Sequence, residues 1–175
     1  MKITSLRLKN WKSYQDVSIS QIPDLCVLVG ANDSGKTGFF DALKFLKECL
    51  TLDLVTTLKK SGGFSEVLRR DAEAESVEID IGFRLSVWQV ETQFNYLLRL
   101  GLENGIAHVL LERLTQEKKV LLEFQNGKGT LDINFNREET ELATGVLALS
   151  TYGRFIKFSV LIEINQALKQ WFFFD

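Results

Sequence analysis

Eight consecutive residues carry the strongest chemical signal in this chain. Residues 30–37 read Gly-Ala-Asn-Asp-Ser-Gly-Lys-Thr and fit the phosphate-binding pattern G-x-x-x-x-G-K-[ST] at every fixed position. Gly30 and Gly35 let the backbone wrap closely around phosphates, so that successive N–H groups and a helix N-terminus face the anion. In this pattern the Lys36 ammonium reaches the β- and γ-phosphates, and the Thr37 hydroxyl ligates Mg²⁺. The motif therefore predicts a site for a nucleoside triphosphate and Mg²⁺.

The whole loop is the candidate cofactor-binding set, with Thr37 as the candidate metal ligand. Asp33 places a carboxylate inside an anion-binding loop, so we expect its side chain to point away from the phosphates. Gly38, directly after the motif, is a weak helix former. It either permits close packing at the helix start or is merely tolerated there. The candidate set is Gly30, Ala31, Asn32, Asp33, Ser34, Gly35, Lys36 and Thr37.

The motif is expected between a buried strand and an amphipathic helix. Residues 25–29 form an apolar run without polar alternation, which is typical of a strand covered on both faces. A second helical piece is expected over residues 51–60. This strand–loop–helix context favours a phosphate site over a chance match. Residues 36–50 carry the apolar stripe of the helix, made of Phe39, Leu43, Leu46 and Leu50.

The rest of the chain is dominated by strands. Short strands are expected around residues 6–8 and 17–19, where apolar and polar residues alternate. From Val77 a period of two is sustained, and Asn104-Gly105 is a strong hairpin signal. This pattern predicts an antiparallel meander rather than a series of βαβ units. Its strands are expected at 77–87, 94–102, 106–114, 118–124 and 130–135, and helices follow at 138–149 and 159–170.

The composition suits one globular domain. The chain has 175 residues, is 45% hydrophobic and carries a formal net charge of −2. A net negative charge does not attract nucleic acid non-specifically, so contact with DNA would need a local basic patch. Cys26 and Cys49 belong to no C-x-x-C or Cys/His cluster and are expected to be buried, reduced thiols. Neither a signal peptide nor an apolar run near ~18 residues is present, so we expect a soluble, cytoplasmic protein without membrane contact.

Four stretches together resemble the N-terminal half of an ATPase head of the RecF/SMC/OLD group, within the AAA/ABC-type P-loop ATPases. They are residues 3–14, which end in Asn-Trp-Lys-Ser-Tyr, the loop at 29–37, Phe-Asp-Ala-Leu at 40–43, and Ser-Gly-Gly-Phe-Ser-Glu-Val-Leu at 61–68 before the Val77 strand. The resemblance implies an α/β P-loop NTPase fold, an ABC-ATPase-like N-terminal lobe with an antiparallel β-subdomain. Within one lobe, 1–175, we expect strands, loop and first helix (1–60), the meander (61–137) and a truncated helical segment (138–175).

The resemblance also implies a function. It implies ATP as the nucleotide, Mg²⁺ as the metal, and two heads that meet as a homodimer around the nucleotide. In such heads the Lys/Ser pair after the first strand lies near the nucleotide, which makes Lys12 and Ser13 candidate ATP contacts. The alternative for this pair is an exposed turn. Trp11 would pack either near the adenine or in the core. Roles in DNA repair, chromosome maintenance or phage defence come from the resemblance alone.

Hydrolysis in this group needs a signature segment, a Walker B Asp–Glu pair and usually a switch histidine. Residues 149–153 and 171–175 imitate the first two loosely, because Tyr152 replaces a small residue and no Glu follows Asp175. His108 falls in a predicted meander strand, where we expect it at or near the surface. Catalytic residues stay unassigned, and the missing motifs are expected beyond residue 175. The Mg²⁺-sensing glutamine cannot be placed among Gln89, Gln93 and Gln166.

Two other functional classes are alternatives to an ATPase. A truncated or degenerate module would bind ATP without hydrolysing it. A P-loop kinase or GTPase is disfavoured, because those folds continue with βα alternation where this chain has a meander. A guanine-recognition motif of the N-K-x-D type is also absent from the sequence.

Overall fold

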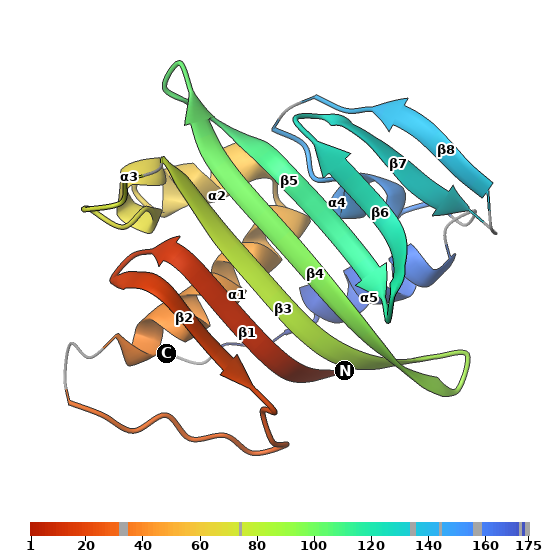
Figure 1. Cartoon of the computed structure of the whole chain (residues 1–175), viewed down its shortest axis with the longest axis horizontal. Helices are drawn as coiled ribbons and strands as arrows, with labels where there is room; N and C mark the ends of the chain where they lie inside the picture. The colour runs from red at the N-terminus through yellow and green to blue at the C-terminus, as the bar shows by residue number, and fades with distance from the viewer. Residues whose placement is uncertain are drawn as a thin grey trace.

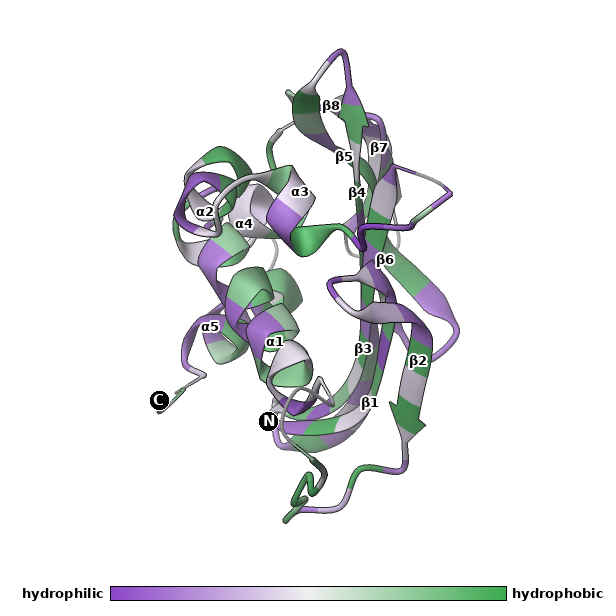
Figure 2. Ribbon diagram, turned by 90° about the vertical axis from the view of Figure 1, so that its left-hand side faces the viewer, coloured by the Kyte–Doolittle hydropathy of each residue, from purple (hydrophilic) through white to green (hydrophobic). Residues whose placement is uncertain are grey.

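The computed structural model describes residues 1–31, 35–73, 75–133, 136–143, 145–155, 159–171 and 173. These residues form two layers, an eight-stranded sheet and a layer of helices on one of its faces (Figures 1 and 2). Neighbouring strands are antiparallel throughout, in the order β2-β1-β3-β4-β5-β6-β7-β8. The mixed α/β class and the antiparallel meander predicted from the sequence are therefore confirmed.

The strands and helices follow one another along the chain with short connections. The strands are β1 (Lys2–Trp11), β2 (Tyr14–Ser20), β3 (Ser76–Val87), β4 (Val90–Glu103), β5 (Ile106–Gln116), β6 (Lys119–Gln125), β7 (Lys128–Ile133) and β8 (Asn136–Glu141). The helices are α1 (Lys36–Thr51), α2 (Leu54–Lys60), α3 (Phe64–Val67), α4 (Ala148–Tyr152) and α5 (Ser159–Lys169). The helices expected at 36–50 and 159–170 are confirmed within one residue at each end.

Alternation along the strands gives the sheet one apolar and one polar face. On β3, Ile79, Ile81 and Phe83 are buried beneath the helices. Their neighbours on β3 point to the other face, where Glu78 accepts hydrogen bonds from the Arg99 guanidinium of β4. This face carries further cross-strand ion pairs, Arg7 with Asp16 and Arg113 with Glu123. No helix of the described residues covers it (Figure 2), which accounts for its polar side chains.

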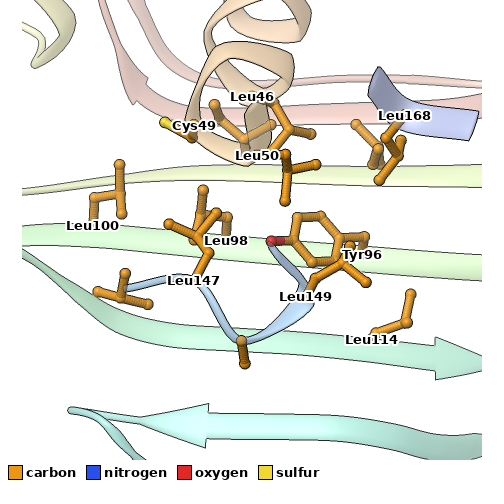
Figure 3. Packing of buried hydrophobic residues seen from close by; sticks show 14 of the residues in the cluster. Leu46, Cys49, Leu50, Tyr96, Leu98, Leu100, Leu114, Leu147, Leu149 and Leu168 are labelled. Atoms are coloured by element: carbon orange, nitrogen blue, oxygen red, sulfur yellow. The ribbon is translucent and has the colours of Figure 1, made fainter. Parts of the chain in front are cut away.

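The core lies between the sheet and the helices α1, α4 and α5. Leu46, Cys49 and Leu50 of α1 face Tyr96 and Leu98 of β4 (Figure 3). Burial raises the pKa of the Cys49 thiol far above its ordinary value, so this cysteine is an inert apolar side chain. The predicted burial of Cys49 is thus confirmed. The sheet and α1 are fixed to each other through this core, and α1 begins at the end of the predicted phosphate loop.

The buried strand expected at residues 25–29 is not observed. This segment has no regular secondary structure, and the side chains of Leu25, Val27 and Val29 are 82%, 72% and 90% exposed. It belongs to a long connection that leaves the sheet after β2 and returns to α1 (Figure 1). An apolar strand is buried on both faces only if other strands flank it, and no described strand does so. Cys26, expected to be buried, is exposed for the same reason.

A second correction concerns the segment after β7. A helix was expected over residues 138–149, but the chain pairs as β8 with β7 up to Glu141, and α4 begins only at Ala148. Glutamate-rich residues favour a helix locally, yet the open edge of β7 offers them backbone hydrogen bonds. The N-terminal hairpin also joins the same sheet, because β1 pairs with β3. The division at residues 60 and 137 remains a prediction. No helix of the described residues is long and apolar enough to cross a membrane.

Candidate phosphate-binding site

The second half of the predicted loop forms the start of α1. Gly35 is the N-cap residue, and Lys36 and Thr37 are the first two residues of the helix. The Lys36 ammonium bonds the carbonyls of Gly30 and Ala31 at 2.8 and 2.5 Å, so it lies against the first half of the loop. The first N–H groups of a helix have no partner within it, and they point toward an anion held at its N-terminus. Asn32, Asp33 and Ser34 lie outside the described residues.

Gly35 has to be a glycine at this position. Its φ of 87° lies in the left-handed region that side chains rarely adopt. A Cβ added to it would also lie 2.9 Å from the Tyr14 hydroxyl and 3.1 Å from Ser13 Oγ. Conformation and space therefore both require the second fixed glycine of the motif.

The turn between β1 and β2 lies directly against the loop and the first turns of α1. The Lys12 ammonium is 2.5 Å from Asp41 Oδ2 on α1. Ser13 faces Gly35, as the 3.1 Å approach to its Cβ position shows. Lys12 and Ser13, the two candidates outside the motif, are thus brought beside the loop although at least 17 positions of sequence separate them from it. The Lys12–Asp41 pair is half exposed and contributes about 0–1 kcal/mol.

Two aromatic residues beside the same turn also hold the helix start, a role that sequence reasoning had not given to either of them. The Tyr14 hydroxyl donates a 2.6 Å hydrogen bond to the carbonyl of Gly35. Trp11 donates from Nε1 to the carbonyl of Gly38 at 3.0 Å. Trp11 is only 1% exposed, so of its two expected places the core is the one observed. The signal for both was present in the quoted stretch Trp-Lys-Ser-Tyr.

Gly38 permits close packing, the first of the two interpretations left open by the sequence. A Cβ at this position would lie 2.8 Å from Cε2 of the Tyr14 ring. The ring also lies beside Phe39, with ring centroids 4.9 Å apart. Burial against these neighbours raises the pKa of Tyr14, which keeps its hydroxyl protonated as a donor.

A hollow of about 560 Å³ opens beside Lys12 and Ser13. Its far wall is the segment after α3, which is tied to the turn by two backbone bonds, Lys12 N–H to the Val67 carbonyl and Arg69 N–H to the Asn10 carbonyl, each 2.8 Å. The hollow combines cationic and acidic side chains. Its lining includes Lys12, Ser13, Ser65, Glu66, Arg69 and Arg70.

The signature-like segment begins in the core, on α4, and most of the Walker B-like segment lies outside the described residues. Leu149 is fully buried, and its N–H group bonds Glu112 within the core. His108 lies on β5 and is 7% exposed, so its strand is as predicted but its burial is deeper. Gln93 on β4 bonds Thr4 on β1. Phe172, Phe174 and Asp175 lie outside the described residues. Within the described residues, no group of three or more acidic, cysteine or histidine side chains could hold a metal.

Known proteins similar to this chain include a DNA replication and repair protein. "DNA replication and repair protein RecF" of Staphylococcus aureus, in strains JH9 and Newman alike, is 26% identical over 116 residues, which is 66% of this chain and 29% of the relative. The chain thus spans less than a third of these relatives' length. A solved structure described as "Structural biochemistry of ATP-driven dimerization and DNA stimulated activation of SMC ATPases" has a TM-score of 0.45 and 20% identity, over 69% of this chain and 72% of that one.

The family comparison covers nearly the whole chain. The model of the AAA ATPase domain family matches residues 1–164, which include the phosphate loop, the β1–β2 turn and the complete sheet. This agrees with the resemblance to P-loop ATPases of the RecF/SMC type that the sequence had indicated. The chain belongs to the AAA ATPase domain family.

Proposed function

We propose that the chain is the ATP-binding N-terminal part of an ATPase of the RecF/SMC type, with its nucleotide at residues 30–37. The observation that carries this proposal is the helix start at Gly35. There a motif loop, a left-handed glycine and the Lys36 side chain converge, and the Lys12–Ser13 turn flanks them. Membership of an ATPase family supports a nucleotide ligand.

Each residue has a distinct part in this proposal. The N–H groups of Lys36 and Thr37 would bind phosphate oxygens, because the first N–H groups of a helix have no partner within the helix itself. The Lys36 ammonium would move from the two carbonyls to the β- and γ-phosphates. The Thr37 hydroxyl would ligate Mg²⁺, which neutralises phosphate charge when it is bound. Lys12 and Ser13 would contact the nucleotide on the side of the hollow.

Hydrolysis would require groups that the described site does not supply. Asp41, the described carboxylate paired within the site, is engaged with Lys12, and the signature-like segment at 149–153 is held in the core. We therefore infer that turnover needs Walker B and signature groups in addition to this lobe, supplied as two heads meet around ATP. Binding without turnover is the second candidate function for the chain by itself.

The cellular setting belongs to the same proposal. The RecF relatives are named for DNA replication and repair, which favours a role in DNA maintenance over one in phage defence. A net charge of −2 gives the chain no general attraction to DNA, so contact would occur in an assembly. We place the protein in the cytoplasm.

Calorimetric titration with ATP and Mg²⁺ tests the site. Wild-type protein should bind ATP, and Lys36→Ala should weaken binding on the order of 100-fold, because phosphate charge loses its cation. Lys9→Ala is the matched control, since Lys9 is an exposed lysine on the polar face of β1, and it should bind as wild type does. Equal affinity of Lys36→Ala and wild type would refute the assignment of the site.

A further inference from the structure

The Gly35 carbonyl accepts two hydrogen bonds at the end of the phosphate loop. It accepts the N–H of Gly38 at 2.7 Å, which closes the first turn of α1. It also accepts the Tyr14 hydroxyl at 2.6 Å. A carbonyl oxygen has two lone pairs, so both are occupied. The orientation of this carbonyl is therefore fixed from two directions, one within the helix and one from the β1–β2 turn.

The orientation of that carbonyl determines where the next N–H points. In a planar trans peptide the C=O of Gly35 and the N–H of Lys36 point in opposite directions. The carbonyl points along α1 and toward Tyr14, so the Lys36 N–H points away from the helix, to the side where the loop lies. Glycine at φ 87° has no side chain to restrict this peptide, so an outside contact is needed to hold it.

Two more contacts join the β1–β2 turn to the same side of α1, and we call the three contacts together the clamp. Trp11 bonds the Gly38 carbonyl, and Lys12 pairs with Asp41. Positions 35, 38 and 41 are three residues apart and so lie along one side of a helix. Tyr14, Trp11 and Lys12 each hold one of these positions. The Tyr14 contact is the one that reaches the phosphate loop itself.

We propose that Tyr14 is a positioning residue for the nucleotide site, whose hydroxyl fixes the Gly35–Lys36 peptide so that the Lys36 N–H faces the phosphates. This inference rests on the proposed function, since it assumes that phosphates bind at the loop. Tyr14 acts through the loop and does not itself need to touch the nucleotide. The absence of a Cβ at Gly38 is what lets the Tyr14 ring come close enough.

The first test removes the hydroxyl and keeps the ring. Tyr14→Phe should weaken ATP binding on the order of threefold to tenfold, the worth of one hydrogen bond. Inorganic tripolyphosphate, which lacks base and ribose, should lose affinity by the same factor because the effect is on the phosphate contacts. The melting temperature should fall by no more than about 2–4 °C, the shift expected for the loss of one hydrogen bond in a chain of this size. The matched control is Tyr152→Phe, which loses a hydroxyl bond to Thr140 at 3.0 Å far from the loop and should bind ATP as wild type does.

A double-mutant cycle tests the ring contact. Gly38→Ala places a Cβ against the Tyr14 ring, so by itself it should weaken ATP binding. In a Tyr14→Ala background the same change should have little further effect, because the obstructing ring is gone. Additive losses in the double variant would contradict the clamp.

The outcomes separate this inference from the proposed function. If wild-type protein binds neither ATP nor tripolyphosphate, the proposed function fails. If wild type binds both, Lys36→Ala does not, and Tyr14→Phe binds as wild type does, only the Tyr14 inference is overturned. A Tyr14→Phe loss confined to ATP would also overturn it, since that result assigns the hydroxyl to the nucleoside.

Discussion

The N-termini of α1 and α4 both present N–H groups that have no partner within their own helix, and the two ends differ in what lies beside those groups. Neither helix has a capping side chain of its own, since Gly35 precedes α1 and Leu147 precedes α4. At α4 the free N–H groups of Ala148 and Leu149 donate to the Glu112 carboxylate at 2.5 and 2.8 Å. At α1 no carboxylate lies in the first turn. One helix end is capped by a carboxyl group from inside the fold, and we propose that a phosphate ligand takes the corresponding place at the other.

The difference teaches what a phosphate site requires beyond a helix end. Glu112 comes from β5, is fully buried, and also accepts the Tyr96 hydroxyl at 2.8 Å. A buried carboxylate needs such partners because its desolvation is costly. At the α1 end, Trp11 and Tyr14 donate to backbone carbonyls, and in the proposed function the first N–H groups of the helix bind phosphate. Glu112 thus stabilises the fold, whereas we propose that the α1 end binds a ligand.

The largest expected effect is the loss of the internal anion. Glu112→Ala would leave two N–H groups and the Tyr96 hydroxyl unpaired in the core, and should lower the free energy of unfolding by about 2–4 kcal/mol. Urea denaturation of the variant measures this loss. The control is Glu123→Ala, which removes an exposed partner of Arg113 and should cost less than about 1 kcal/mol. Equal losses in the free energy of unfolding would show that the α4 cap contributes no more to stability than this ion pair.

The pH dependence of stability sharpens the comparison. Burial raises the pKa of Glu112 from 4.5 to about 7, although its three hydrogen-bond donors oppose the shift. A raised folded-state pKa stabilises the protein fully below the unfolded value, and this contribution is lost as pH rises through about 7. Wild-type stability should therefore fall relative to Glu112→Gln between about pH 4.5 and 7.

Comparison of the two proteins isolates Glu112 from other groups that titrate nearby. Tyr96 stays protonated, because burial and the Glu112 charge raise its pKa well above 10, and Cys49 is likewise a neutral thiol. Urea melts at several pH values provide the measurement. Parallel curves for the two proteins would mean that Glu112 keeps its ordinary pKa.

The two helix ends also differ in how well the sequence predicts them. The loop at α1 is a local motif of eight residues, so its type and the start of the helix follow from the printed order. The α4 cap joins residues 36 and 37 positions apart, and no local pattern marks Glu112 among the other glutamates of the chain. Tyr14 is an intermediate case, because it belongs to a recognised stretch but its contact with Gly35 depends on the fold.

The errors in the sequence analysis also arose where the structure depends on contacts that the local pattern does not specify. The alternation from Val77 onward predicted the meander because both faces of those strands are specified by their own residues. Residues 25–29 appeared buried because they are apolar, but burial depends on flanking strands that the described fold does not give them. Residues 138–141 favoured a helix by composition, whereas the free edge of β7 made them a strand. Strand pairing, which composition alone does not specify, decided each case.

The smallest expected effect concerns α2, the helix that caps itself locally. Asp53 accepts the Thr56 N–H and hydroxyl, each at 2.7 Å, and these bonds hold the pKa of Asp53 below its usual value. Asp53→Ala should lower the melting temperature by roughly 2–4 °C and leave ATP affinity unchanged. Asp71→Ala, an exposed aspartate 3.9 Å from Arg69, is the matched control and should show no shift. Loss of a cap between sequence neighbours lowers stability only slightly, because water can reach the freed N–H groups. A Tm loss as large as that of Glu112→Ala would show that burial does not set the worth of a cap.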